Sequence, residues 1–192
     1  MRNYLFLLLI WAYSGLVGAT VIQPQYGDDD GLGLGLTEGE SFYWADLPRT
    51  GADLTDIWLR GDINLDLNYD LGGMSSVTSA SLLIGTGGQG WMGPTSLYID
   101  GSLVGQLTDG DDGGNFYRRD SFDLTPYLAL LDGANSFFID LVGDGDGWSL
   151  DFLQLTLSDD PGVSVGPLVV PTPAAAMLFC SALAGLVCIR RR

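Results

Sequence analysis

The amino-acid sequence predicts an all-β fold: a single antiparallel β-sandwich of the jelly-roll type, with one short helix. Short runs of alternating apolar and polar residues recur from residue 41 onward, which is the period of half-buried strands. Clusters of Gly and Asp, which favour tight turns, separate these runs. Apolar stretches at the two ends predict an N-terminal signal peptide and a C-terminal transmembrane helix, which flank the sandwich.

The clearest strand signals lie in the first two thirds of the chain. Residues 63–69 alternate strictly, and residues 77–84 form a second, more buried run. Residues 96–99 and 102–107 flank the dipeptide Asp100-Gly101, which predicts a β-hairpin. Asp and Gly tolerate the positive φ angles of a type I′ turn, whose twist matches that of paired strands.

The remaining segments complete the sandwich. Residues 136–142 and 149–157 predict two further strands, joined by the glycine-rich residues 143–147. Residues 20–39 predict an irregular segment or a weak edge strand. The helical segment is residues 124–131, with Thr125 expected as its N-cap and Pro126 at its first helical position.

The N-terminal 19 residues have the three parts of a signal peptide. Arg2 supplies the positive charge, residues 5–12 are apolar, and small residues precede Ala19. We expect cleavage between Ala19 and Thr20, with an uncleaved N-terminal anchor as the alternative. The exported β-sandwich is then residues 20–162, the size of one domain with its own core.

The C-terminal segment predicts a membrane span behind a short linker. Residues 163–173 form the linker and sorting motif, and residues 174–192 a transmembrane helix with a basic tail. The 16 uncharged residues 174–189 would cover about 24 Å of a hydrocarbon core about 30 Å thick. Positive charge after the span places this end on the cytoplasmic side; it comes from Arg190, Arg191 and Arg192.

This tail resembles the PEP-CTERM sorting signal of Gram-negative bacteria, in its Val-Pro-x-Pro-Ala variant. The motif is Val170, Pro171, Thr172 and Pro173, with Thr172 where the named form has Glu. The resemblance implies a transient anchor in the inner membrane and processing by an exosortase. Display on the cell surface or in the extracellular matrix would follow. An ordinary C-terminal membrane anchor is the alternative.

Composition restricts the partners and the chemistry. Residues 20–166 hold all 24 acidic residues but only four arginines, a formal charge of −20. This charge repels nucleic acid and anionic membranes and attracts cations, among which carboxylates favour Ca²⁺. The chain has no His and no Lys, which excludes His-based acid–base chemistry, Schiff-base lysines and P-loops. Both cysteines lie in the C-terminal tail, so no disulfide stabilises the sandwich.

A second resemblance concerns the latter half of the sandwich. Residues 122–125, 131–135, 137–141 and 148–152 resemble galactose-binding-like jelly rolls. This resemblance carries no catalytic residues. It implies a domain that binds glycans, calcium or both.

Two acidic loops are the candidate metal sites. The first contributes Asp109, Asp111 and Asp112, and the second Asp144 and Asp146, with Asp151 beyond it. Calcium takes six to eight oxygen ligands, and carbonyls of glycine-rich loops commonly complete such a shell. The alternative is that both are solvated acidic turns. We expect residues 28–30, which are three consecutive aspartates, to be solvated.

Aromatic residues are the candidate glycan contacts, because sugar rings present apolar C–H faces to aromatic planes. The candidates are Trp91, Tyr98 and Tyr117, of which Trp91, in a glycine-rich loop, is expected to be exposed. Packing within or at the edge of the core is the alternative for each. Trp148, at the start of a strand, is expected to fill one end of the core.

These observations together predict an exported, non-catalytic protein with a structural or adhesive role, in contact with exopolysaccharide. The first alternative is a dedicated carbohydrate-binding module, with or without Ca²⁺. The second is a carboxylate-based glycoside hydrolase, which requires two acids on opposite sides of a sugar bond.

Overall fold

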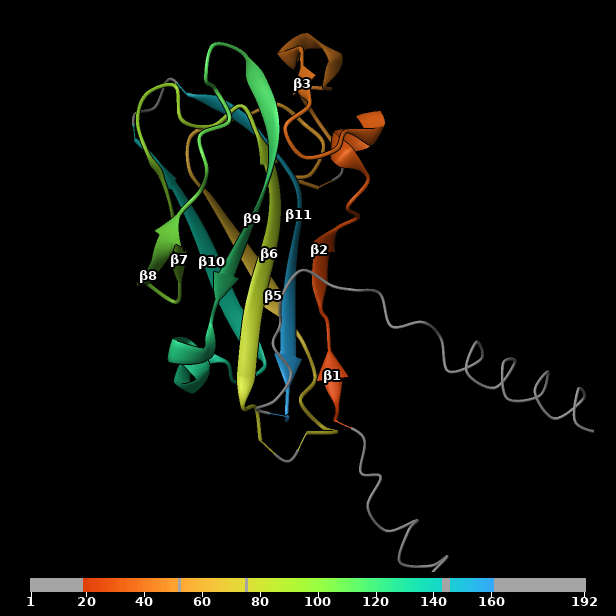
Figure 1. The fold of residues 1–192 in the computed structure, drawn as a ribbon, viewed down its shortest axis with the longest axis vertical. Helices are drawn as coiled ribbons and strands as arrows, with labels where there is room; N and C mark the ends of the chain where they lie inside the picture. The colour runs from red at the N-terminus through yellow and green to blue at the C-terminus, as the bar shows by residue number, and fades with distance from the viewer. Residues whose placement is uncertain (1–18, 52, 75, 143–145, 161–192) are drawn as a thin grey trace, which may run out of the picture.

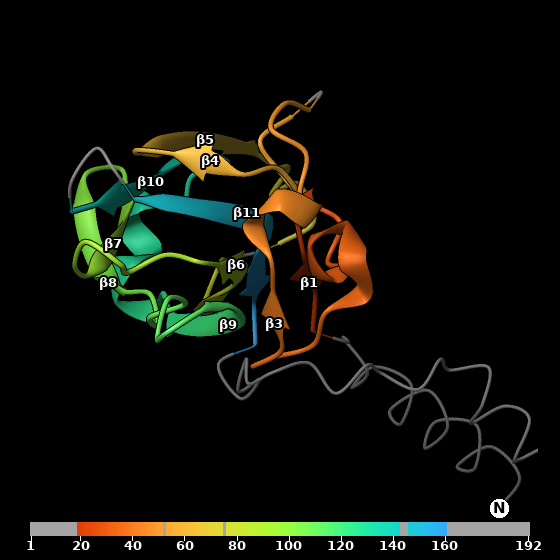
Figure 2. The ribbon, with the colours of Figure 1, turned by 90° about the horizontal axis from the view of Figure 1, so that it is seen from above.

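The computed structural model describes residues 19–51, 53–74, 76–142 and 146–160. Two sheets face each other and enclose one core, and every pairing between their strands is antiparallel (Figure 1). The predicted antiparallel β-sandwich is therefore confirmed. Seen from above, the two sheets form separate layers, with β11 (Gly147–Ser158) in one and β10 (Ala134–Leu141) in the other (Figure 2).

The larger sheet has seven strands and is organised around β11. On one side β11 pairs with β6, which pairs with β9, which pairs with β3. On the other side three short strands, β1, β2 and β4, pair with successive parts of β11. The bounds are β1 (Val21–Ile22), β2 (Gln25–Gly27), β3 (Ser41–Phe42), β4 (Leu59–Arg60), β6 (Ser79–Gly87) and β9 (Asn115–Asp123).

The smaller sheet has four strands in the order β5-β10-β7-β8. Its other members are β5 (Ile63–Asn68), β7 (Thr95–Ile99) and β8 (Ser102–Gln106). In β5 the alternation seen in the sequence becomes alternation of burial, with Ile63, Leu65 and Leu67 facing the core. They meet apolar residues of β6 and β11 from the opposite sheet, and burial of this apolar surface stabilises the fold.

The hairpin between β7 and β8 turns at the predicted dipeptide. Asp100 has φ 46° and Gly101 has φ 78°, both in the left-handed region that a type I′ turn requires. The Asp100 side chain also accepts hydrogen bonds from the Ser136 backbone N–H and the Asn135 amide. This contact ties the hairpin turn to β10.

The three short helical elements differ in part from the expectation. The predicted helix is the 3-10 helix η3 (Thr125–Leu130), whose N-cap residue is Leu124, not Thr125. The Thr125 hydroxyl instead accepts a hydrogen bond from the Ala80 N–H at 3.4 Å, so it connects η3 to β6. The other two elements are η1 (Gly31–Gly35), a π-type turn, and η2 (Trp44–Asp46), a 3-10 turn.

Strand β9 is a central strand that the sequence did not predict. It lies between β6 and β3 in the larger sheet. Its middle carries Arg118, Arg119 and Asp120, so its polar side chains hide the period of a buried strand. Tyr117 is the one fully buried position of β9.

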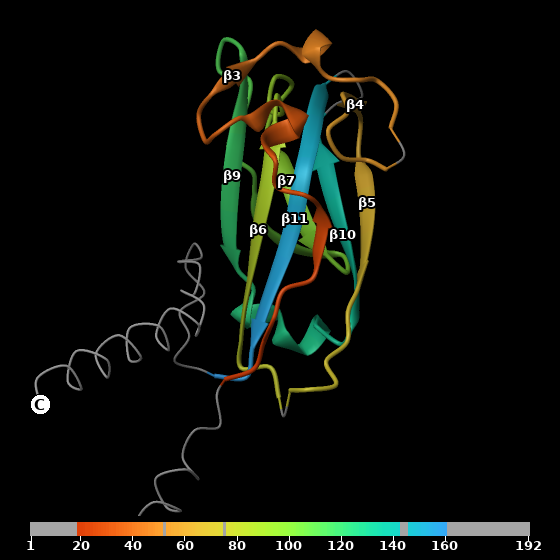
Figure 3. The ribbon, with the colours of Figure 1, turned by 90° about the vertical axis from the view of Figure 1, so that its right-hand side faces the viewer.

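The first and last described residues meet at one end of the sandwich. The Thr20 N–H donates to the Asp159 carboxylate at 2.7 Å, and the Asp159 N–H donates to the Thr20 carbonyl at 3.3 Å. β1 and the end of β11 lie at this end, whereas η2 and β3 lie at the opposite end (Figure 3). Every strand of the described residues lies between Val21 and Ser158.

The predicted membrane segments lie outside the described residues. They are residues 1–18 of the signal peptide and residues 161–192, which include the sorting motif and the basic tail. No helix in the described ranges is long and apolar enough to span a bilayer.

Candidate cation site and loop-end cleft

A β-bulge in β11 builds the candidate cation site. The pairing of β11 with β6 shifts by one residue between Leu150 and Phe152. Leu150 and Leu153 both face the core, so the two residues between them, Asp151 and Phe152, lie on the outer side of the larger sheet. The bulge therefore places a carboxylate on this outer face, although Asp151 belongs to an almost continuously buried strand.

A second, smaller apolar cluster covers this outer face. Leu32 of η1, Leu47 and Tyr117 are its buried members, and Leu36, Phe42 and Trp58 pack against them. Leu32 adopts φ 62°, a left-handed conformation that turns η1 sharply over the sheet. The segments that carry Leu32, Leu47 and Trp58 thus cover Asp151, whose side chain is fully buried.

Only one oxygen of the Asp151 carboxylate has hydrogen-bond partners. Oδ2 accepts from the Gly31 N–H at 3.2 Å and from the Tyr117 hydroxyl. Oδ1 is buried and has no partner among the described residues, and the same holds for Oδ1 of Asp56. A buried carboxylate oxygen without a partner costs free energy, so both oxygens fit a site that a cation completes.

Four carboxylates converge at this point. Asp28, Asp30, Asp56 and Asp151 each offer one oxygen, and these four oxygens lie within 4.8 Å of one another. A Ca²⁺ ion binds oxygen at about 2.3–2.6 Å, so two of its ligands stand at most about 5 Å apart. A purely carboxylate set suits hard cations such as Ca²⁺, Mg²⁺ or Mn²⁺. The residues present therefore fit a hard divalent cation.

The electrostatics of the cluster favour such a cation. Burial, together with the charges of the neighbouring Asp30, Asp151 and Asp28, raises the pKa of Asp56 to about 7. Burial and the charges of Asp30 and Asp151 also raise the pKa of Asp28. Asp29, next in sequence to Asp28 and Asp30, forms an ion pair with Arg119 at 2.9 Å. Proximity of like charges is unfavourable, and a divalent cation would relieve it.

The sequence predicted one of these four residues. Asp151 was a candidate ligand, whereas residues 28–30 were expected to be solvated. Asp28 and Asp30 are indeed exposed, but both reach the cluster. Asp56 carried no sequence signal. A signal for the bulge was present, because the spacing of Leu150 and Leu153 breaks the alternation of the strand.

The other predicted metal ligands do not join this cluster, and Asp144 lies outside the described residues. Asp109 accepts from the Asp111 N–H at 2.8 Å and so closes its own loop. Asp146, only 2% exposed, accepts from the N–H groups of Gly90, Met92 and Gly147 at 3.0, 3.5 and 2.9 Å. Asp146 therefore holds the glycine-rich loop after β6 against the start of β11.

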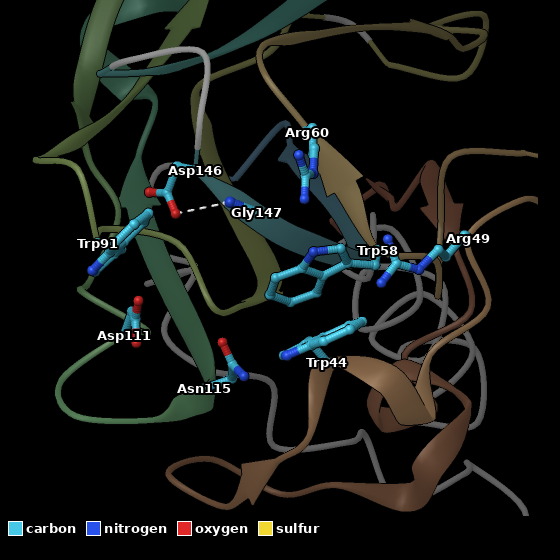
Figure 4. Close-up of a pocket in the computed structure, with 9 residues that line it drawn as sticks. All are labelled: Trp44, Arg49, Trp58, Arg60, Trp91, Asp111, Asn115, Asp146 and Gly147. Atoms are coloured by element: carbon cyan, nitrogen blue, oxygen red, sulfur yellow. Dashed lines mark hydrogen bonds between the residues drawn. The ribbon is translucent and has the colours of Figure 1, made fainter.

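The loop-end cleft is a pocket of about 340 Å³ at the end of the sandwich where β11 begins (Figure 4). It is open to solvent, and three of its lining side chains, those of Arg49, Arg60 and Trp91, are exposed. Its lining comprises Trp44, Arg49, Trp58, Arg60, Trp91, Asp111, Asn115, Asp146 and Gly147. Three of the five tryptophans of the chain thus lie around one pocket.

One wall of the cleft is aromatic and basic. The Trp44 and Trp58 rings are 6.5 Å apart at an angle of 41°, and the Arg49 guanidinium lies 4.6 Å above the Trp44 ring. Arg60 stands beside Trp58 on the same wall (Figure 4). Gly147 allows this arrangement, because a Cβ there would stand 2.5 Å from Nε1 of Trp58.

The opposite wall carries Trp91 and the acidic side chains. Trp91 is 67% exposed, and Asp146 and Asp111 lie next to it (Figure 4). Burial and the charges of Asp146 and Asp109 raise the pKa of Asp111. The cleft therefore separates an arginine side from a carboxylate side, with indole rings on both.

Of the predicted glycan contacts, the structure places only Trp91 at the cleft. Tyr98 lies on β7 and packs against Phe138 at 5.9 Å, on the outer face of the smaller sheet. Tyr117 is 1% exposed, so its ring belongs to the core and cannot stack on a ligand. Trp148 is fully buried and donates to the Gly61 carbonyl at 3.1 Å, as expected of a residue that fills the end of the core. Trp44 and Trp58 carried no signal that set them apart from core residues.

No model of a known protein family matches this chain, and no curated protein does. Among solved structures it is similar to latent PorU from Porphyromonas gingivalis, with 13% identity and a TM-score of 0.43 over 74% of this chain and 13% of that one. It is similar to a family 36 carbohydrate-binding module of a xylanase from the hindgut metagenome of Trinervitermes trinervoides, with 11% identity, a TM-score of 0.36, and 72% and 96% of the two chains covered.

A family 35 carbohydrate-binding module from Clostridium thermocellum gives 13% identity and a TM-score of 0.32 over 71% of this chain and 90% of that one. The chain spans only a small part of the larger proteins, such as 21% of a β-porphyranase from Bacteroides plebeius. We draw no functional conclusion from these likenesses, because the TM-scores are below 0.5.

Proposed function

We propose that this chain is an exported, non-catalytic protein that binds carbohydrate in the loop-end cleft and holds one structural Ca²⁺ in the four-aspartate cluster. The observation that carries the proposal is the convergence of Trp44, Trp58 and Trp91 on one open pocket beside hydrogen-bonding side chains. Indole planes accept the apolar faces of sugar rings, and Asn and Asp side chains pair with hydroxyl groups.

The position of the cleft supports a role in display. The cleft lies at the first residues of β11, whereas the first described residues of the chain pair with its last residues, Leu157 and Ser158. A 12-residue strand spans roughly 36 Å, so the cleft is remote from that end of the sandwich. A protein anchored through its C-terminal tail would present the cleft away from the membrane. This arrangement fits export, exosortase processing and contact with exopolysaccharide outside the cell.

The arrangement of acids favours binding over hydrolysis. A glycosidase needs two carboxyl groups on opposite sides of the scissile bond. The acids that line the cleft, Asp111 and Asp146, both lie on the Trp91 wall (Figure 4). Asp146 is also occupied by three backbone N–H groups. Asp111, which is half-buried, is therefore the carboxylate of the cleft that is suited to accept hydrogen bonds from sugar hydroxyls.

Binding of residues 20–162 to a glycan array, followed by calorimetry with the best oligosaccharide, tests the proposal. Trp91→Ala removes an exposed ring, so it should weaken binding about fivefold to tenfold without loss of stability. The matched control is Tyr98→Ala on the outer face of the smaller sheet, which should leave binding unchanged. Absence of any glycan binding, or equal effects of the two substitutions, would overturn the proposal.

A further inference from the structure

We infer that the ligand of the loop-end cleft is an acidic sugar, one that carries a carboxylate or a sulfate ester; this inference rests on the proposed function. The observation is the distribution of arginines. The described residues contain four, and two of them, Arg49 and Arg60, line the same cleft. In a segment with 24 acidic residues, two arginines at one pocket indicate that the pocket binds a negatively charged group.

The other two arginines, unlike Arg49 and Arg60, form ion pairs with acidic side chains. Arg119 pairs with Asp29 at 2.9 Å, and Arg118 approaches Glu38 at 4.0 Å. Arg49 and Arg60 form no ion pair within the described part of the chain, although both are exposed. Among the described residues, two guanidinium groups thus have no carboxylate partner although acids outnumber arginines.

The geometry prepares these groups for an anion. The Arg49 guanidinium is stacked on Trp44 at 4.6 Å, which fixes its plane and leaves its N–H edge free to donate. A planar guanidinium matches the two oxygens of a carboxylate or sulfate group in a bidentate contact. Arg60 stands on the other side of Trp58 on the same wall (Figure 4). A ring stacked on this wall would therefore have an arginine within reach of an acidic substituent on either side of Trp58.

The opposite wall orients the ligand. Asp111 and Asp146 repel an anionic group, so the acidic substituent would face the arginine wall and the hydroxyls the carboxylate wall. The charge of the whole domain repels polyanions at long range, but salt at about 0.1 M screens it beyond about 10 Å. Selectivity for an acidic ring therefore depends on the contacts inside the cleft.

Calorimetry with short oligosaccharides of matched stereochemistry tests the inference at about 0.15 M salt. The probes are trigalacturonate, its carboxyl-reduced form trigalactose, and a 6-sulfated trigalactose, with matching sets of gluco and manno configuration. In at least one set we expect an acidic probe to bind about fivefold to tenfold more tightly than the neutral one. The comparison of uronate with sulfate then distinguishes the two acidic groups.

Substitutions assign the preference to the arginines. The double variant Arg49→Gln/Arg60→Gln should lose the preference and keep neutral binding, whereas Arg49→Lys/Arg60→Lys should keep part of it. Arg118→Gln, which removes one positive charge outside the cleft lining, should leave the preference unchanged. Equal affinity for acidic and neutral probes, or a preference that survives the double Gln substitution, would overturn the inference but leave carbohydrate binding intact. Failure of every probe, acidic and neutral, would overturn both.

Discussion

At the scale of single residues, Asp151 decides whether the acidic cluster is a site. Its side chain is fully buried, and its Oδ1 atom has no hydrogen-bond partner among the described residues. A buried, half-satisfied carboxylate destabilises a fold unless something compensates it. As long as no cation is bound, the negative charges of the three other carboxylates destabilise the fold further. A bound Ca²⁺ ion would replace this repulsion between carboxylates by attraction of each carboxylate to the ion.

We therefore predict that calcium stabilises residues 20–162 and that Asp151→Asn abolishes the effect. At a hundredfold excess over its Kd, a bound ion adds about 2.7 kcal/mol, which raises Tm by about 6–11 °C. Asn keeps an acceptor for the Gly31 N–H and the Tyr117 hydroxyl, so the variant should fold. Asp66→Asn, on the exposed side of β5, is the control and should retain the full shift. A calcium-independent Tm in the unsubstituted protein would rule out the site.

The same stabilisation has a defined pH dependence. The pKa of Asp56 is about 7 in the metal-free folded state, above its value of 3.8 in an unfolded chain. Between these values the folded state holds a proton that the unfolded state lacks, so metal-free stability falls as pH rises from about 4 to about 7. Calcium must displace that proton. The calcium-induced Tm shift should therefore be small at pH 5 and complete at pH 8.

At the scale of elements, the close contact of three strands holds the cation site in place. Gly85 of β6 lies under the Phe152 ring of β11 and the Tyr117 hydroxyl of β9, and a Cβ there would stand 2.6 Å from each. This approach allows Tyr117 to donate to Asp151. Glycine is required here for space and not for its φ angle.

Gly85→Ala should therefore cost about 1–3 kcal/mol of unfolding free energy and weaken calcium binding, because Phe152 or Tyr117 must move. Chemical denaturation in the presence and absence of calcium measures both effects. The matched control is Gly114→Ala, whose added Cβ would find its nearest neighbour, in Phe116, at 3.7 Å. If Gly114→Ala lowers stability and Gly85→Ala does not, the close approach of Gly85 to Phe152 and Tyr117 is not required for stability.

The sequence predicted the positions of strands better than it predicted which residues of different elements come together in a site. Alternation located β5, β10 and the hairpin, because one face of each strand is buried and the other is exposed. It missed β9, whose arginines and aspartate mask the pattern. The cation cluster joins residues 28 and 151, which lie next to the Gly27–Phe152 couple of β2 and β11, and its key carboxylate depends on a bulge. Such sites arise from register and loop placement, which composition and local period do not report.

At the scale of the whole molecule, one segment connects the cation site to the loop-end cleft. Asp56 belongs to the acidic cluster, and Trp58, two residues further, belongs to the cleft wall. The Asp56 N–H donates to the Leu150 carbonyl at 2.8 Å, and the Trp58 N–H donates to the Pro48 carbonyl at 2.9 Å. The second bond ties the segment to the chain that carries Trp44 and Arg49. A cation that fixes Asp56 would thus fix the aromatic wall.

This connection predicts that calcium and carbohydrate bind cooperatively. Removal of calcium should weaken binding of the best oligosaccharide about fivefold to tenfold, and by linkage the oligosaccharide should tighten calcium binding by the same factor. Calorimetric titration of each ligand in the presence and absence of the other measures the two factors. Asp56→Asn should lower the effect of each ligand on the affinity for the other. Asp66→Asn, remote from the segment, should leave both effects unchanged. If calcium removal leaves the sandwich folded and its carbohydrate affinity unaltered, the two sites are independent and the cation has only a stabilising role.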